Sequence, residues 1–248
     1  MNEEEIKLLK TLIDKAKHIV FFGGAGVSTE SGIMDFRSEK GLYNLKSKYG
    51  LPYEVMLSST YFYKDTDTFF KFYKEFMINK NAKPNECHKY LANLEKEKKL
   101  TIITQNIDNL HQLAGSKNVL ELHGSIYRNH CISCGKSFDI DYILKSNDTP
   151  HCDRCNGIVK PDVVLYEEGL SMITLNKSIK VLQNADLLIV AGTSLNVYPA
   201  AGLIDYFNGD NIVLINTADQ VLNRKIKLFI KGKCGEIFSK LWLELYFH

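Results

Sequence analysis

Residues 18–29 read His-Ile-Val-Phe-Phe-Gly-Gly-Ala-Gly-Val-Ser-Thr, an apolar run followed by a glycine-rich turn. The unbroken apolar run predicts a strand that is covered on both faces, because half-exposed strands alternate instead. Glycines directly after such a strand let backbone N–H groups approach a pyrophosphate. Thr29 stands where a full dinucleotide fingerprint has its third glycine, so a plain tight turn is the alternative.

Three more apolar runs predict strands of the same kind, at residues 100–104, 186–191 and 211–215. Segments with apolar residues at helical spacing lie between them, as at 3–16 and 86–98. Strands that alternate with helices predict an α/β fold with a doubly wound parallel sheet.

Two stretches break this alternation. One is an aromatic-rich, helical segment at about 40–81, and the other is a cysteine-rich segment at about 125–159. Both are predicted insertions into one domain spanning 1–248, whose sheet part comprises about 1–39, 82–124 and 160–248. The aromatic side chains favour packing between helices, and the alternative is a lid or pocket wall.

The composition excludes several classes of protein. The 248 residues are 45% hydrophobic and 24% charged, which allows a sizeable core and argues against a disordered chain. Thirty-one basic and twenty-nine acidic residues give a net charge of +2, too small to drive nucleic-acid binding. The acidic start at residues 2–5 and the lack of a long apolar run predict neither a secretory signal nor a membrane span. We therefore expect a cytoplasmic protein with no specific nucleic acid and no membrane partner.

Four of the six cysteines form two Cys-x-x-Cys pairs, Cys131 with Cys134 and Cys152 with Cys155. The pairs are separated by residues 135–151, a spacing typical of a four-thiolate zinc site. Glycines at 135 and 157 follow the pairs, where the chain must turn tightly. Four sulfur ligands leave no position for a catalytic water, so the predicted zinc is structural.

Small and polar residues follow the later strands. Gly192, Thr193 and Ser194 follow the apolar run 186–191, and Asn216 and Thr217 follow the run 211–215. Ligands of open α/β sheets bind outside the carboxyl ends of the strands. These strand ends and the glycine-rich turn therefore predict one crevice.

Three clusters remain as candidates for the reacting centre, namely residues 31–37, residues 104–111 and the pair His123-Gly124. His123 ends the apolar run 119–122 and adjoins the cysteine segment, which suits a cleft between sheet and insertion. A histidine there can exchange protons near neutral pH, and a structural histidine is the alternative.

Taken in order, these motifs resemble the sirtuins, a family of NAD-dependent protein deacylases, over nearly the whole chain. The matching stretches are residues 24–37, 104–111, 123–124, the four cysteines and 192–195. The resemblance implies a Rossmann-like sheet domain with a helical insertion and a zinc module, and NAD in the cleft between them.

The resemblance also implies roles for matching residues. Ala25, Thr29 and Arg37 would lie beside the phosphates, Gln105 and Asn106 near the nicotinamide ribose, and Ile107 and Asp108 on the carboxamide. Phe36 would close over the nicotinamide, and Thr193, Ser194 and Asn216 would bind the adenosine half. The remaining cofactor-binding residues are Gly24, Gly26, Ser28, Asp35, Gly192, Thr217 and, beside the adenine, Cys234. The implied catalytic residues are His123 as general base, Asn106 and Asp108.

In the implied reaction, the amide oxygen of an acyl-lysine attacks C1′ of the nicotinamide ribose as nicotinamide leaves. His123 then deprotonates a ribose hydroxyl, and water releases lysine and O-acyl-ADP-ribose. NAD is consumed as a co-substrate. The alternative enzyme is a mono-ADP-ribosyltransferase using the same pocket, and the alternative non-enzyme is a zinc-ribbon binding module. The presence of His123 favours deacylation over ADP-ribosyl transfer. The near-neutral net charge disfavours a zinc-ribbon module that binds nucleic acid.

An acyl-lysine protein or peptide would add as a strand between residues 167–170 and 196–198. The substrate-binding residues implied there are Val164, Leu165, Tyr166, Glu168, Leu170, Asn196, Val197 and Tyr198. We expect the protein to be a monomer.

Several positions depart from the family pattern. Met34 replaces a usual proline, Tyr166 a usual phenylalanine and Glu167 a usual glycine. Phe70 and Tyr73 stand where desuccinylating sirtuins carry a tyrosine and an arginine. Because a cation for an acidic acyl tail is missing, we expect acetyl or longer apolar acyl groups and not succinyl.

Overall fold

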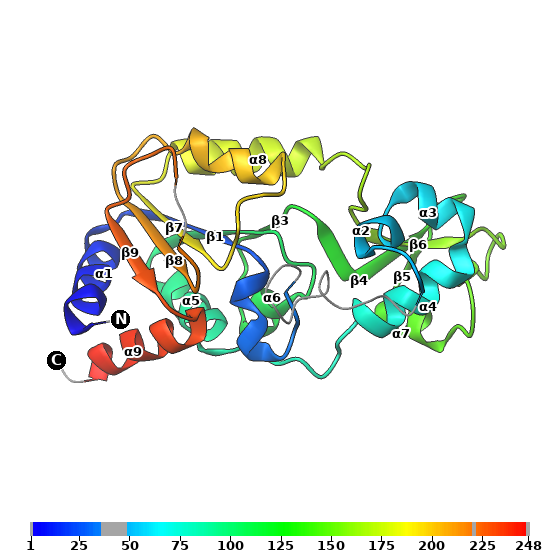
Figure 1. Ribbon diagram of the computed structural model, residues 1–248, viewed down its shortest axis with the longest axis horizontal. Helices are drawn as coiled ribbons and strands as arrows, with labels where there is room; N and C mark the ends of the chain where they lie inside the picture. Colours follow the sequence, from blue (N-terminus) through cyan, green and yellow to red (C-terminus); the bar gives the residue numbers. More distant parts are fainter. Residues whose placement is uncertain (1, 36–48, 220–221, 247–248) are drawn as a thin grey trace.

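Six parallel strands form the main sheet, in the spatial order β3-β2-β1-β7-β8-β9 (Figure 1). They are β1 (His18–Gly23), β2 (Lys99–Thr104), β3 (Val119–Glu121), β7 (Leu187–Ala191), β8 (Ile212–Asn216) and β9 (Leu228–Lys231). Counted along the chain, this is the 3-2-1-4-5-6 order of Rossmann sheets. The predicted α/β fold is confirmed, and each of the four predicted strands agrees with its observed bounds to within one residue.

The structure is a computed structural model and describes residues 2–35, 49–219 and 222–246. Phe36 and Arg37, both predicted to contact NAD, lie outside the described residues.

Helices cover both faces of the sheet. In β1, Ile19 and Phe21 belong to a core shared with α1 (Glu3–Lys15), α5 (Glu86–Glu97) and α9 (Cys234–Tyr246). Val20 and Phe22 belong to a second core, shared with α8 (Met172–Gln183) and η4 (Ala200–Tyr206). Successive side chains of a strand point to opposite faces, so an unbroken apolar run supplies both cores.

Local side-chain bonds fix the start of α1. The side chain of Asn2 accepts a hydrogen bond from the backbone N–H of Glu5 at 2.8 Å, and the Asn2 N–H donates to the Glu5 carboxylate at 2.7 Å. Such a reciprocal capping box satisfies N–H groups that have no partner within the helix. The predicted helix over 3–16 is confirmed as Glu3–Lys15.

A second, smaller body contains the described parts of both predicted insertions. Its antiparallel sheet has the order β5-β4-β6, formed by β4 (Gly124–Cys131), β5 (Ser137–Phe138) and β6 (Val159–Val163). Its helices are α2 (Tyr53–Met56), α3 (Ser59–Lys64), α4 (Thr66–Phe76) and α7 (Ile140–Lys145). Figure 1 shows this body at the end of the long axis opposite α1 and α9.

One hydrophobic core holds the second body together. Phe62, Phe69, Phe70 and Phe72 are fully buried, and they share this core with residues of the cysteine segment such as Val159. Packing, the favoured prediction for the aromatic segment, is confirmed for these side chains. The two insertions, which are separate in sequence, therefore fold against each other.

Polar contacts reinforce that union. The Nζ of Lys74 in α4 donates to the backbone carbonyl of Ser146 at 2.6 Å, and the Asp67 carboxylate accepts from the Thr149 N–H at 3.1 Å.

None of the helices in the described part of the chain is long and apolar enough to cross a membrane.

Candidate active site

The turns that follow β1 and β7 fit closely against each other. The Gly26 N–H donates to the carbonyl of Gly192 at 2.8 Å, and Gly192 has a left-handed φ of 58°. A Cβ added at Gly24 would lie 2.6 Å from the Cβ of Thr193, and one added at Gly26 would lie 2.8 Å from the Cα of Gly192. These glycines are therefore required by the contact between two strand ends, whatever ligand binds beside them.

Side chains from three strand ends meet at Thr193. The amide Nε2 of Gln105, after β2, donates to the Thr193 hydroxyl at 3.0 Å. The amide Nδ2 of Asn216, at the end of β8, donates to the Thr193 carbonyl at 2.9 Å, and the Asn216 side-chain oxygen accepts from the Thr217 N–H. The predicted convergence of these strand ends is thus present, with Ser194 next along the chain.

A hydrogen-bonded chain links the first turn to the loop after β2. Asn106 Nδ2 donates to Ser28 Oγ at 3.0 Å, and Ser28 Oγ donates to Asp108 Oδ2 at 2.6 Å. The other carboxylate oxygen of Asp108 accepts from the Leu110 N–H at 2.9 Å, at the start of α6 (Leu110–Ala114). Ser28 is fully buried, so this chain fixes the two implied catalytic residues Asn106 and Asp108 relative to the glycine turn.

Burial raises the pKa of Asp108, and the hydrogen bond from Ser28 opposes that effect. A buried carboxylate needs such donors to remain charged.

His123 lies at the junction of the two bodies, between β3 and β4. Its Nδ1 is 2.8 Å from the carbonyl oxygen of Gln105. A carbonyl oxygen only accepts, so Nδ1 carries the proton and a neutral His123 presents the lone pair of Nε2. Burial lowers the pKa of His123, partly offset by this hydrogen bond. The residue is therefore held as a neutral imidazole in one tautomer, which is the form a general base requires.

The other residues of the first turn lie close by. Ala25 begins η1 (Ala25–Val27), and Thr29 begins η2 (Thr29–Ser31), with its hydroxyl donating to the Gly26 carbonyl at 3.1 Å. Asp35 ends the described segment. The turn is also held by Asn85, whose Nδ2 donates to the Val27 carbonyl at 2.8 Å.

Two predicted cofactor neighbours are engaged within the protein. The carbonyl of Ile107 accepts from the Ile126 N–H at 3.1 Å, which ties the loop after β2 to β4. The side chain of Cys234 is 2% exposed and packs in the core beside α5, and burial raises the pKa of its thiol to about 12. A contact of Cys234 with an adenine would therefore involve its backbone at the start of α9.

The segment after β6 connects the base to the predicted substrate site. The Val164 N–H donates to the carbonyl of His123 at 3.0 Å. Leu165 is buried in the second body, whereas Tyr166 is 36% exposed. Lys160 and Glu168 hold this segment, because Lys160 Nζ lies 3.1 Å from both the Val163 carbonyl and the Glu168 carboxylate.

The partner segment follows β7. Leu195 has a left-handed φ of 53°, and Tyr198 is 76% exposed. Asn196 and Val197 lie between them, and Leu170 packs partly buried against the core beside α8. Within the described residues, no backbone hydrogen bond joins 166–170 to 196–198. Because the two segments do not pair with each other, a strand that adds between them displaces no hydrogen bond that joins them.

The four predicted zinc ligands form a compact cluster in the second body. Their Sγ atoms all lie within 4.8 Å of one another, with 3.4 Å between Cys131 and Cys155 and 3.7 Å between Cys134 and Cys152. Zn–S bonds of about 2.3 Å give a tetrahedron with edges of about 3.8 Å. The cluster therefore fits a zinc ion that is closed to other ligands.

Each Cys-x-x-Cys pair forms a tight turn, a zinc knuckle. Both knuckles contain a residue with a left-handed backbone, but the residue type differs. Gly135 has a φ of 70°, and in the second knuckle Asn156 has a φ of 59°. The prediction that Gly157 supplies the second turn is therefore wrong. Gly157 is instead needed for space, since a Cβ there would lie 2.4 Å from the Ser133 hydroxyl oxygen and 2.9 Å from Cys131 Sγ.

Several residues of the site were not found from the sequence. Asn85 and Lys160 act through hydrogen bonds, to the carbonyls of Val27 and Val163. Thr104, by contrast, belongs to the predicted cluster 104–111, and its hydroxyl accepts the Asn106 N–H at 3.0 Å. Glu30 accepts from the Glu236 N–H at 3.1 Å and thereby anchors the start of α9 to η2. A polar residue at the end of an apolar run was a signal for Thr104, whereas Glu30 and Asn85 bond to residues far away in the sequence.

Comparisons with known proteins agree with this geometry. The model of the Sir2 family matches residues 24–199. An NAD-dependent protein deacetylase of Clostridium acetobutylicum is 57% identical over 95% of this chain and 97% of its own, and one of Clostridium tetani is 56% identical over 96% and 98%. A structure of Sir2 with a p53 peptide and NAD+ superposes with a TM-score of 0.85 at 35% identity, covering 98% of this chain and 99% of that one. Sir2Tm bound to a propionylated peptide gives 0.85 at 34% identity, with the same coverage.

Proposed function

The chain belongs to the Sir2 family, and from that premise we propose that it is an NAD-dependent protein deacetylase, or deacylase, which transfers the acyl group of a lysine to ADP-ribose. The observation that carries the proposal is the position of His123. A neutral histidine, fixed in one tautomer, lies where the glycine turn, the Ser28–Asp108 pair and the segment after β6 come together.

The residues of the crevice suit NAD. The turns after β1 and β7 offer backbone groups and small side chains where parallel strands end, and amides and hydroxyls surround Thr193. When bound, NAD supplies the ADP-ribose that receives the acyl group and the nicotinamide that leaves. The cofactor-binding set given above, including Phe36 and Arg37, remains our proposal for its contacts.

The chain's own groups have separable tasks. The Asn106–Ser28–Asp108 chain orients an amide and a carboxylate at the crevice, which supports positioning of the nicotinamide end. The Nε2 of His123 takes a proton from a ribose hydroxyl. His123 and Asp108 are both only partly exposed, which limits the contact of these two groups with water.

Acyl-lysine proteins or peptides are the substrates, entering as a strand between 167–170 and 196–198. The relatives solved with p53 and propionylated peptides support this substrate class. Phe70 and Tyr73 are fully buried in the second body, and neither side chain carries a positive charge that could hold an acidic acyl tail. This supports acetyl and longer apolar acyl groups over succinyl.

A mono-ADP-ribosyltransferase using the same NAD site is the alternative reaction, and the relatives named as deacetylases do not favour it. Zinc, held by Cys131, Cys134, Cys152 and Cys155, is structural, since four thiolates complete its shell.

We further propose a monomeric, cytoplasmic enzyme without a nucleic-acid or membrane partner. Its near-neutral charge and its bacterial relatives support this. We also propose a helical insertion at 40–81 and a zinc module at 125–159. The separate core of the second body supports such a division, although that core continues beyond 159 to Val163 and Leu165.

The decisive experiment incubates an acetyl-lysine peptide with the protein, with and without NAD, and follows peptide mass and nicotinamide. We expect loss of the acetyl group, and release of nicotinamide, only when NAD is present. If neither occurs with acetyl, propionyl or longer acyl peptides, the proposal is wrong. Transfer of ADP-ribose to the peptide with the acetyl group retained would favour the alternative.

A further inference from the structure

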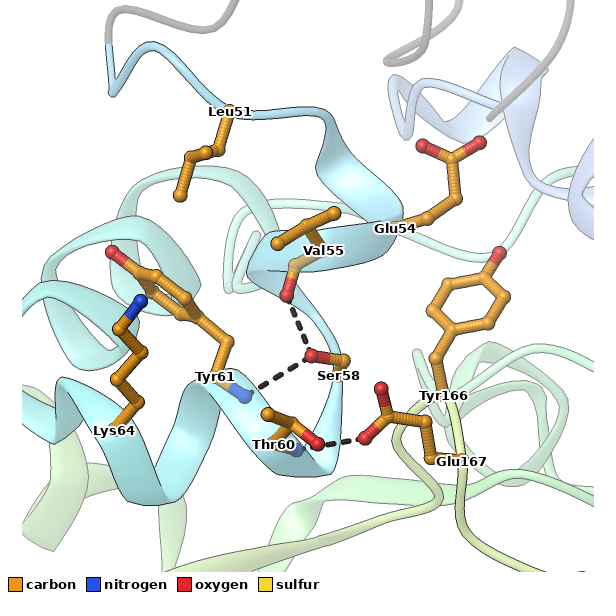
Figure 2. Close-up of a pocket in the computed structure, with 9 residues that line it drawn as sticks. All are labelled: Leu51, Glu54, Val55, Ser58, Thr60, Tyr61, Lys64, Tyr166 and Glu167. Carbon is orange, nitrogen blue, oxygen red and sulfur yellow. Dashed lines mark hydrogen bonds between the residues drawn. The ribbon is translucent and has the colours of Figure 1, made fainter.

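A cavity of about 420 Å³ opens in the second body, between α2, α3 and the segment after β6 (Figure 2). Its lining residues are Leu51, Glu54, Val55, Ser58, Thr60, Tyr61, Lys64, Tyr166 and Glu167. Among these, Tyr166 and Glu167 belong to the segment already proposed to contact the substrate. The volume is well above that of one amino-acid side chain and lies within the range of ligand sites.

The cavity shares a wall with the proposed peptide channel. The Tyr166 N–H donates to the Leu57 carbonyl, and the Ser59 N–H donates to the Tyr166 carbonyl, both at 3.0 Å. These bonds join one edge of Tyr166 to α2 and α3. The residues that follow, 167–170, are those proposed to pair with the substrate strand. When a substrate peptide pairs with residues 167–170, one of its side chains is therefore close to the cavity.

Glu167, which replaces a usual glycine, is fixed at this wall. Its φ of 75° is a left-handed conformation that costs a non-glycine residue about 1 kcal/mol. One carboxylate oxygen accepts from the Thr60 N–H at 2.8 Å, in the first turn of α3. Hydrogen bonds from Thr60 lower the pKa of Glu167, so the carboxylate is charged at neutral pH. A glycine would adopt this backbone more easily but would bring no charge to the cavity.

The remaining residues that line the cavity include apolar and aromatic side chains. Its charged side chains lie on opposite sides of the cavity. Leu51 and Val55 are both exposed, and in Figure 2 Leu51 lies on the side of Tyr61 while Val55 stands between Tyr61 and Tyr166. Glu54 forms no ion pair or hydrogen bond with any described residue. Among the lining residues that the structure describes, Lys64 is the one cation.

Figure 2 shows Lys64 beside Tyr61, on the side of the cavity opposite Glu54 and Tyr166. The side next to the peptide channel is therefore anionic. A long side chain with an apolar stem and a cationic head matches this combination, because its stem covers apolar groups and its head interacts with aromatic rings and carboxylates.

We propose that this cavity is a substrate subsite that takes an arginine or lysine side chain neighbouring the acyl-lysine in the same chain. The inference rests on the proposed function, because the cavity adjoins the channel of a peptide substrate. Glu54 and Glu167 supply the negative charge, so they determine a preference for acyl-lysines with basic neighbours.

The test measures kcat/KM for acetyl-lysine peptides of otherwise uncharged sequence, in which one arginine is moved through the three positions on each side. At one position or more, we expect arginine to raise kcat/KM about fivefold over alanine, mainly through KM. Glutamate at that position should lower it. Equal rates for arginine and alanine at every position, or faster turnover with glutamate, would overturn the proposal.

Three variants test whether the cavity causes the preference for arginine. Glu54→Gln and Glu167→Gln should each reduce the arginine-to-alanine ratio toward one, and glutamine can keep the hydrogen bond to Thr60. Lys64→Gln should increase the ratio, because it removes a like charge. Glu97→Gln, on the exposed end of α5, is the matched control and should leave the ratio as in the wild type.

Ratios that stay at the wild-type value in all three cavity variants would place the preference elsewhere and contradict the proposal. If no peptide is deacetylated at all, the proposed function is wrong. If peptides are deacetylated without any preference for a basic neighbour, the proposed function stands and the subsite is wrong.

Discussion

His123 illustrates how one backbone carbonyl determines the chemistry of a side chain. The Gln105 carbonyl accepts from Nδ1, and burial lowers the pKa of the imidazole below its usual 6.5. Near neutral pH the free lone pair is therefore on Nε2, and the histidine is already in the form of a base. The backbone carbonyl of His123 accepts the Val164 N–H, so the position of His123 depends on the segment that we propose as one wall of the substrate channel.

Replacement of His123 by alanine should reduce deacetylation by about a hundredfold or more, since it removes the proposed base. Binding of NAD, measured by calorimetry, should change little. In the wild type, kcat/KM should fall as pH drops through the lowered pKa of His123, that is, below 6.5, because protonation removes the lone pair. Full activity of the alanine variant, or an acid limb well above pH 6.5, would rule out this role.

At the scale of elements, α5 and α6 meet through two histidines. The rings of His88 and His111 have centroids 4.7 Å apart, and both side chains are buried. The Asn85 N–H donates to His88 Nδ1 at 3.3 Å, which requires an unprotonated Nδ1. Burial lowers the pKa of His88 to about 4 and that of His111 well below 6.5, the latter with a further contribution from His88. The contact between the two helices is therefore built from neutral imidazoles.

This contact should make folding stability depend on pH. Both histidines stay neutral in the folded protein but take up a proton near pH 6.5 in the unfolded chain, so their contribution is present above pH 6.5 and is lost as pH falls below it. Between pH 6.5 and pH 5, His88 should cost about 2 kcal/mol of the free energy of unfolding, and His111 should lower it in the same direction.

Denaturant unfolding of the wild type and of His88→Gln over this range measures the effect. The variant should lose less stability on acidification than the wild type, whereas His151→Gln, at an exposed histidine, should behave as the wild type does. Equal pH dependence in all three proteins would contradict the assignment.

Across the whole molecule, the zinc site belongs to the same core as the helices of the other insertion. Cys131 and Cys152 are buried among residues that include Phe62 and Phe69 of α3 and α4. Each face of the main sheet has its own, separate core. Loss of the metal should therefore unfold the second body, including α2 to α4, before the sheet.

Cys131→Ser should lose bound zinc and peptide deacetylation, because it removes one thiolate from the tetrahedron. Hydrogen exchange should rise in residues 53–76 and 124–163 and remain low in β1, β2 and β7. Asp153→Ala, which breaks an exposed ion pair with Lys136 beside the knuckle, is the control and should keep the metal. Retained zinc in Cys131→Ser, or unfolding spread evenly over both bodies, would contradict this division.

The sequence predicted the strands that are apolar on both faces and missed the two short strands at the edges of the sheet. β3 has three residues, Val119–Glu121, and β9 has four, Leu228–Lys231, and each contains fewer than four consecutive apolar residues. Cysteine spacing likewise predicted the sulfur cluster, because ligand geometry constrains spacing. It did not predict that Asn156 makes the second knuckle's turn, since asparagine and glycine both tolerate a left-handed backbone.

Contacts distant in sequence could not be predicted from local pattern. Gly24 and Gly26 matched a phosphate-binding turn, yet their immediate neighbours are Gly192 and Thr193 on another strand end. Glu167 was recognised only as a departure from the family. Its hydrogen bond to Thr60 and its place in a cavity depend on how the second body folds.

The arrangement of the terminal helices has a practical consequence. α1 and α9 pack against each other at the end of the molecule farthest from β4–β6 (Figure 1). A tether or fluorescent label attached to the exposed face of either helix therefore stands well away from the peptide channel. The enzyme can be immobilised through this end with the channel directed outward, toward large acylated proteins as readily as toward short peptides.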